Sequence, residues 1–177
     1  MITKILTVVG LLLLTHTFSN TPTYAAEKSC FTADGSYYIF TWSMRKPDGA
    51  IRFKIECDQI EITNLNPGFE STEVYQANQK TCMTDAHSLE SFSCTTYIPG
   101  AESALLEMTR ESHRNTTAGP MNFTAFSTLE ISKNVDYTDA LSGHYVTRTE
   151  VNYPAHPEYN DRSETIREIV YGKRRLK

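Results

Sequence analysis

The chain has little charge, and what charge it has is not predominantly positive. Charged residues make up 21% of its 177 residues, and 21 acidic residues outnumber 17 lysines and arginines. This balance excludes the broad positive field on which nucleic-acid binding depends. With 40% hydrophobic and 11% aromatic residues, the composition also excludes intrinsic disorder. We therefore expect one globular domain that does not bind nucleic acid.

Motifs that fix a reaction by local spacing are absent as well. The sequence contains no G-x-S-x-G, phosphate-binding glycine loop, dinucleotide fingerprint, H-E-x-x-H or EF-hand loop. No two of His87, His113, His144 and His156 are spaced by two or four residues, and the cysteines form no C-x-x-C pair. The sequence thus predicts no cofactor and no metal site. An enzyme whose residues come from several distant strands is still compatible with it, with His87 or His144 as the candidates.

The N-terminus has the pattern of an export signal. Lys4 precedes an uncharged run from Ile5 to Leu14, and Thr23-Tyr24-Ala25 places small residues where signal peptidase requires them. The run is shorter than the roughly 20 residues that span a bilayer, and no later run is longer. We predict a signal peptide over 1–25, no transmembrane segment, and a mature domain over 26–177 that is secreted or periplasmic.

All four cysteines lie in the predicted mature part. An even number of cysteines in an exported chain indicates disulfides rather than free thiols. Three pairings are open. We favour Cys30 with Cys57 and Cys82 with Cys94, because each cysteine then pairs with its nearest neighbour in the sequence. Each bond should stabilise the fold by about 3 kcal/mol.

Alternation with period two runs through most of the chain. Ile51, Phe53 and Ile55 fall on one face of a strand that follows a turn at 46–49, and charged residues fall on the other. The same alternation predicts strands over 38–45, 91–98, 121–132 and 145–153.

Two segments are ambiguous between strand and helix. Segment 101–112 fits a helical stripe and a strand equally well, and 165–171 fits a strand or a short helix. Counting the strands gives about six to nine, separated by turn residues and without a repeat. The fold class is therefore all-β, a single antiparallel β-sandwich or small β-barrel with two disulfides and at most one short helix.

Three apolar residues lie where a half-buried strand should be polar. We expect the face of Tyr38, Phe40 and Trp42 to be buried, which places Tyr37 and Ile39 opposite it. Phe126 interrupts the polar face of its own strand. Packing in a core explains such residues; the functional interpretation is a binding patch formed by Tyr37, Ile39 and Phe126.

The C-terminus carries four positive charges, Lys173, Arg174, Arg175 and Lys177. Such a tail predicts a weak, salt-sensitive contact with an anionic surface.

Taken together, these patterns favour an exported, non-catalytic binding or interaction protein. Its partner could be a protein, a glycan or a small apolar ligand. The alternatives are an exported hydrolase with dispersed active-site residues and a structural component of the envelope or surface.

Overall fold

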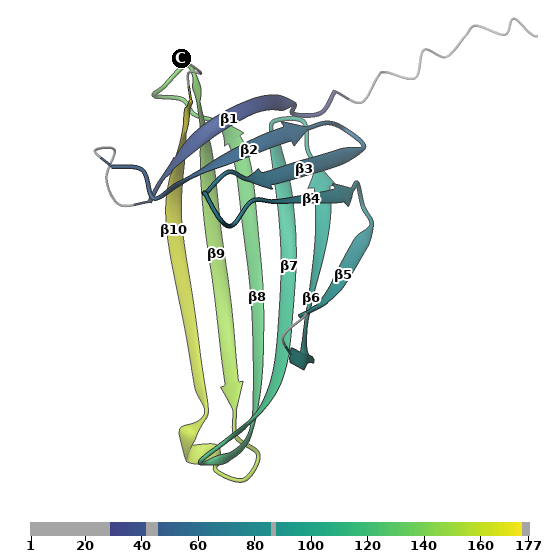
Figure 1. The fold of residues 1–177 in the computed structure, drawn as a ribbon, viewed down its shortest axis with the longest axis vertical. Helices are drawn as coiled ribbons and strands as arrows, with labels where there is room; N and C mark the ends of the chain where they lie inside the picture. The colour runs from purple at the N-terminus through teal and green to yellow at the C-terminus, as the bar shows by residue number, and fades with distance from the viewer. Residues whose placement is uncertain (1–28, 42–45, 86–87, 175–177) are drawn as a thin grey trace, which may run out of the picture.

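The computed structural model describes residues 29–41, 46–85 and 88–174, which form one antiparallel sheet of ten strands (Figure 1). The strand order is β4-β3-β2-β1-β10-β9-β8-β7-β6-β5. Strands that follow one another in the chain are paired in the sheet, except for β4 and β5, which form its two edges. In addition, the first strand, β1, pairs with the last, β10. The sheet is therefore a nearly closed barrel that is open between β4 and β5. The strands are β1 Ala33–Phe40, β2 Gly49–Ile55, β3 Gln59–Asn64, β4 Ser71–Gln76, β5 Lys80–Asp85, β6 Ser88–Pro99, β7 Ser103–Thr116, β8 Gly119–Lys133, β9 Ala140–Asn152 and β10 Asp161–Lys173.

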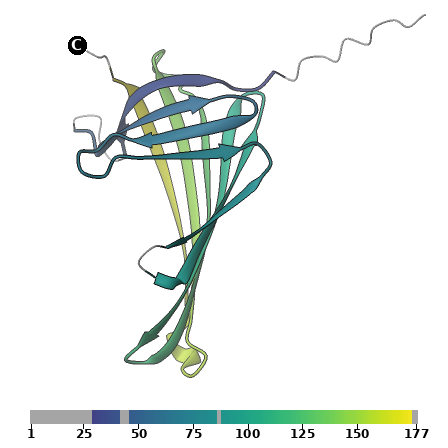
Figure 2. The same ribbon diagram turned by 45° about the vertical axis from the view of Figure 1, so that its right-hand side comes forward.

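The strands differ in length, and this difference shapes the molecule. Strands β1 to β4 have six to eight residues, whereas β6 to β10 have 12 to 15. Figures 1 and 2 show that the short strands lie across one end of the long strands. The other end of the long strands extends beyond them as a single layer. Two layers thus enclose a core at one end only.

The core lies between the short strands and the covered end of the long strands. Phe53 of β2 is fully buried, and its ring meets that of Tyr171 edge-on at 5.0 Å. The ring of Tyr37 also packs against that of Phe53, with the ring centres 5.9 Å apart. The other large, fully buried side chains are Ile55, Ile60, Tyr97, Leu106 and Ile131. Burying this apolar surface is the main force that holds the two layers together.

Tyr97 of β6 ties together the open side of the barrel. Its hydroxyl donates to the carbonyl of Glu56 at 2.7 Å, and its own carbonyl accepts from the amide of Asn78 at 2.7 Å. Ala77, just after β4, forms a parallel bridge with Tyr97. Burial, with a smaller contribution from the charge of Asp58, raises the pKa of Tyr97 to about 12. Through its hydroxyl and its backbone, Tyr97 therefore links β6 to the β2–β3 connection and to the β4–β5 connection.

Both predicted disulfides are present. Cys30–Cys57 joins the segment before β1 to the connection between β2 and β3, and Cys82–Cys94 joins directly paired residues of β5 and β6. The described residues contain no free cysteine. The predicted pairing and the all-β fold class are confirmed.

The structure resolves the ambiguous segments in favour of strands. Segment 101–112 lies mainly in β7, and 165–171 lies in β10. Within the part of the chain that is described, the one helical element is a 3-10 turn at Pro157–Tyr159. A strand at 80–85 was not predicted. The described residues form ten strands, one more than the upper end of the predicted range.

The predicted orientation of β1 is wrong. Tyr37 is 6% exposed and Ile39 packs against the core, whereas Tyr38 is 37% exposed on the opposite face. Both faces of this strand carry large apolar residues, so alternation alone could not choose between them. Pairing with β2 and β10 decides, because it places Tyr37 opposite Ile51 on the core side. Trp42 lies outside the described residues.

Candidate functional site

The inner face of the long strands is the face that carries Leu106, Ile131 and Tyr171 in the core. Side chains alternate along a strand, so this face continues beyond the short strands. There its composition changes first to small and hydroxyl-bearing residues, before Phe123 and Met121 follow near the start of β8. Along β8, Ile131 and Leu129 give way to Ser127 and Ala125. The uncovered end therefore has a shallow inner surface instead of a filled core.

A groove of about 430 Å³ lies on this inner face, where β4 crosses the long strands. Its apolar lining comes from Met83 of β5, Met108 of β7, and Phe123 and Ala125 of β8. Residues with hydroxyl groups form most of the remaining lining: Tyr75, Ser93, Thr95, Thr109, Ser127, Tyr145, Thr147 and Thr149. The charged residues of the described lining are Glu73 and Arg110. Most of the lining residues are polar, but the surface that they expose to the groove is mostly hydrocarbon.

Hydrogen bonds between neighbouring strands fix the floor of the groove. The hydroxyls of Ser127 and Thr147 lie 2.7 Å apart, and that of Tyr145 donates to Ser127 at 3.2 Å. Thr149 and Ser163 form a similar contact at 2.6 Å. Because these hydroxyls already have partners, this part of the floor is neutral and ordered before any ligand arrives. Such a floor offers methyl groups and spare acceptor positions to a ligand.

Tyr75 and Glu73 of β4 form one wall. The Tyr75 hydroxyl donates to the Glu73 carboxylate at 2.5 Å, and Thr95 on the floor hydrogen-bonds to Tyr75. Burial, followed by the hydrogen bond to Glu73, raises the pKa of Tyr75 to about 12. Tyr75 is only 4% exposed and keeps its proton at neutral pH. The wall is therefore held in place by a chain of hydrogen bonds.

The structure does not bring the predicted binding residues together. Tyr37 and Ile39 lie in the core, whereas Phe126 is 56% exposed on the outer face of the long strands. Two of the three thus serve packing, and Phe126 remains a surface residue. Sequence reasoning missed the groove residues. The signal in the sequence is the change along one face of β8 from Ile131 and Leu129 to Ser127 and Ala125.

The candidate catalytic histidines do not form an enclosed site. His144 Nδ1 lies 2.5 Å from Glu168 Oε1 on the outer face, and both side chains are exposed. His113 contacts Asn122 at 2.8 Å. His87 lies outside the described residues. Within 29–41, 46–85 and 88–174, no group of three potential ligands could hold a metal ion.

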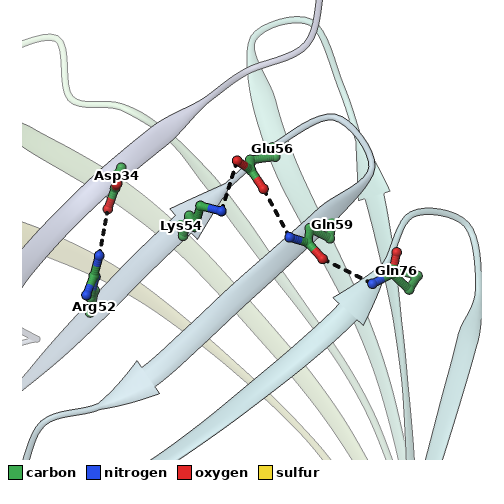
Figure 3. Close-up of polar contacts among 6 residues, drawn as sticks. All are labelled: Asp34, Arg52, Lys54, Glu56, Gln59 and Gln76. Carbon is green, nitrogen blue, oxygen red and sulfur yellow. Dashed lines mark hydrogen bonds and ion pairs between the residues drawn. The ribbon is translucent and has the colours of Figure 1, made fainter.

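Paired polar groups cover the outer surface of the short strands (Figure 3). Lys54 contacts Glu56 at 3.1 Å, and Gln59 donates to Glu56 at 3.0 Å. Gln76 of β4 extends the chain by donating to Gln59 at 3.1 Å. These contacts hold the pKa of Glu56 below its usual value, with the hydrogen bonds from Gln59 and Lys54 as the main causes. This surface satisfies its own polar groups, so the groove is the better candidate site.

The described part of the basic tail belongs to the fold. Lys173 ends β10, and the amide of Arg174 donates to Ser36 at 2.7 Å while its guanidinium lies 5.5 Å from the centre of the Tyr38 ring. Arg175 and Lys177 lie outside the described residues, and contact with an anionic surface stays a prediction. No helix in the described residues has the length and apolar character needed to cross a membrane.

Comparison with family models, curated proteins and solved structures finds no match to this chain.

Proposed function

We propose that the chain is an exported, non-catalytic binding protein that holds a small, mainly apolar molecule in the inner-face groove. Export is supported by the signal pattern over 1–25 and by the two disulfides, which indicate an oxidising compartment. The observation that carries the proposal is the groove itself. Its volume of about 430 Å³ and its mixture of apolar groups and neutral hydroxyls are typical of small-molecule sites.

The lining indicates the chemistry of the ligand. Met83 and Met108 are flexible and polarizable, and they adapt to irregular apolar shapes. Phe123 and Ala125 extend this apolar surface along β8. Over the hydroxyl-lined part of the floor, away from Glu73 and Arg110, burying a charge is costly unless it is paired. The part of the ligand that enters the groove should therefore be uncharged and mostly hydrocarbon, with one or two groups that exchange hydrogen bonds with hydroxyls.

A fluorescence titration with N-phenyl-1-naphthylamine, an uncharged apolar probe, tests the proposal. The mature chain should enhance the emission of the probe in a saturable manner. Ala125→Phe fills the groove and should weaken binding at least tenfold. Thr124→Phe adds the same bulk on the opposite face of β8 and should leave the affinity unchanged. Equal affinities for the two variants, or the absence of saturable binding to the folded chain, would refute the proposal.

A further inference from the structure

Glu73 places a carboxylate on the inner face of β4, at the margin of the groove. In the pairing of β3 with β4, Glu73 lies opposite Ile62. Tyr75 lies opposite Ile60. Both isoleucines belong to the core or pack against it, so the side chains of Glu73 and Tyr75 project toward the long strands. Both residues line the groove, where Glu73 is exposed and Tyr75 is buried.

The carboxylate of Glu73 is held in place but is not paired with a cation. It accepts the hydrogen bond of the Tyr75 hydroxyl at 2.5 Å. A carboxylate has about four acceptor positions, so this bond leaves most of them open. None of the ion pairs in the described part of the chain includes Glu73. Tyr75 thus fixes the position of the carboxylate without supplying a positive charge.

Arg110 of β7 is the other charged residue of the described lining. It already has an interaction partner within the chain. A ligand anion would have to share Arg110 with that partner, whereas a ligand cation meets Glu73 with acceptor positions still open. The groove therefore favours a positive group on the ligand over a negative one.

Apolar lining begins beside the wall that carries Glu73. Thr95 on the floor hydrogen-bonds to Tyr75, and Thr95 pairs directly with Met108 of β7. Ala125 of β8 lies one inner-face position beyond the residue that pairs with Met108. A ligand with its positive group at Glu73 can therefore lay a hydrocarbon chain over Met108 toward Ala125.

We propose that the ligand of the groove is a cationic amphiphile, a molecule with an apolar body and a protonated amine that binds Glu73. This inference rests on the proposed binding function and names the class of its ligand. The amine donates to the carboxylate in a charge-assisted hydrogen bond at the margin of the groove. The apolar body lies on the neutral part of the floor, where a charge would be costly. The excess of acidic residues in the chain, 21 against 17 basic ones, also favours a cation.

Displacement of bound N-phenyl-1-naphthylamine by decylamine, decanol and decanoate tests this inference. The three competitors share one alkyl chain and differ in the charge of the head group. At neutral pH, decylamine should displace the probe at a concentration about fivefold lower than decanol, because charge-assisted hydrogen bonds are roughly twice as strong as neutral ones. Decanoate should be the weakest competitor, because its carboxylate would face that of Glu73.

Two variants locate the preference. Glu73→Gln removes the charge and keeps a carbonyl oxygen that can accept from Tyr75, and it should abolish the advantage of decylamine over decanol. Glu107→Gln is the matched control, because Glu107 adjoins Met108 on β7 but is exposed on the opposite face, and it should preserve this advantage. A urea midpoint within the range of the parent chain confirms that each variant is folded.

The outcomes separate the ligand class from the binding function. If the probe binds but decylamine is no better than decanol, or if Glu73→Gln keeps the advantage of decylamine, the ligand class is wrong and the groove remains a binding site. Stronger displacement by decanoate than by decylamine would overturn the ligand class in the same way. If the probe does not bind to the folded chain, the binding function fails and the ligand class fails with it.

Discussion

Replacing Tyr97 with phenylalanine removes one hydroxyl from the open side of the barrel. That hydroxyl donates to the carbonyl of Glu56 at 2.7 Å from a side chain that is fully buried. Phenylalanine keeps the ring and leaves the carbonyl without this donor. The free energy of unfolding should fall by about 1 to 3 kcal/mol, because an unmet buried acceptor costs its desolvation. For a domain of this size, each kcal/mol lowers the melting temperature by roughly 2 to 4 °C.

The same substitution should change how stability depends on pH. The pKa of Tyr97 rises from 10.0 to about 12 on burial, so its contribution to stability is complete below pH 10. As pH rises from 10 through 12, the unfolded chain loses this proton while the folded chain keeps it, and the free energy of unfolding falls. Tyr97→Phe should reduce the slope of this decline.

Urea unfolding followed by circular dichroism at several pH values measures both effects. Tyr159→Phe is the control, because Tyr159 is 55% exposed in the 3-10 turn. Loss of its hydroxyl should change neither the free energy of unfolding nor its dependence on pH. If Tyr97→Phe is as stable as the parent chain at pH 7 and shows the same decline above pH 10, the assigned role of this hydroxyl is wrong.

Three further sets of substitutions should change the free energy of unfolding by different amounts. Phe53→Ala empties the centre of the core and should lower the free energy of unfolding by about 3 to 5 kcal/mol in urea melts; a loss below 1 kcal/mol would contradict the described packing. Replacing both Cys30 and Cys57 with alanine removes the disulfide that closes a loop with a sequence separation of 27. The free energy of unfolding should fall by about 3 kcal/mol. An unchanged urea midpoint would show that the bond does not constrain the unfolded chain. Phe126→Ser should change the stability of the monomer by no more than about 0.5 kcal/mol in dilute solution, because the ring is largely exposed; a loss comparable to that of Phe53→Ala would place Phe126 in the core.

Local patterns predicted much of the sheet. Strand β2 follows from the turn at 46–49 and from Ile51, Phe53 and Ile55 on one face, whereas β1 begins at Ala33 and shares only 38–40 with the predicted strand over 38–45. Strands β6, β8 and β9 follow from equally regular alternation, and the disulfide pairing follows from sequence proximity. These features depend on neighbours in the sequence, which is why the sequence alone indicates them.

Features that depend on distant strands could not be predicted in this way. Segment 101–112 fits helix and strand alike, and it becomes β7 because β6 and β8 pair with it on both sides. The edge strand β5 has few apolar residues and gave no clear pattern. The groove arises because β4 crosses strands that lie far from it in the sequence. Its hydroxyls look like ordinary polar positions until this crossing is known.

NMR of the methionine methyl groups tests the binding groove most directly. Met83 and Met108 line the groove, whereas Met121 of β8 lies on the same inner face outside the lining. Titration with N-phenyl-1-naphthylamine should shift the methyl signals of Met83 and Met108 and leave that of Met121 in place. A probe that binds while both groove methionines keep their positions would contradict the account.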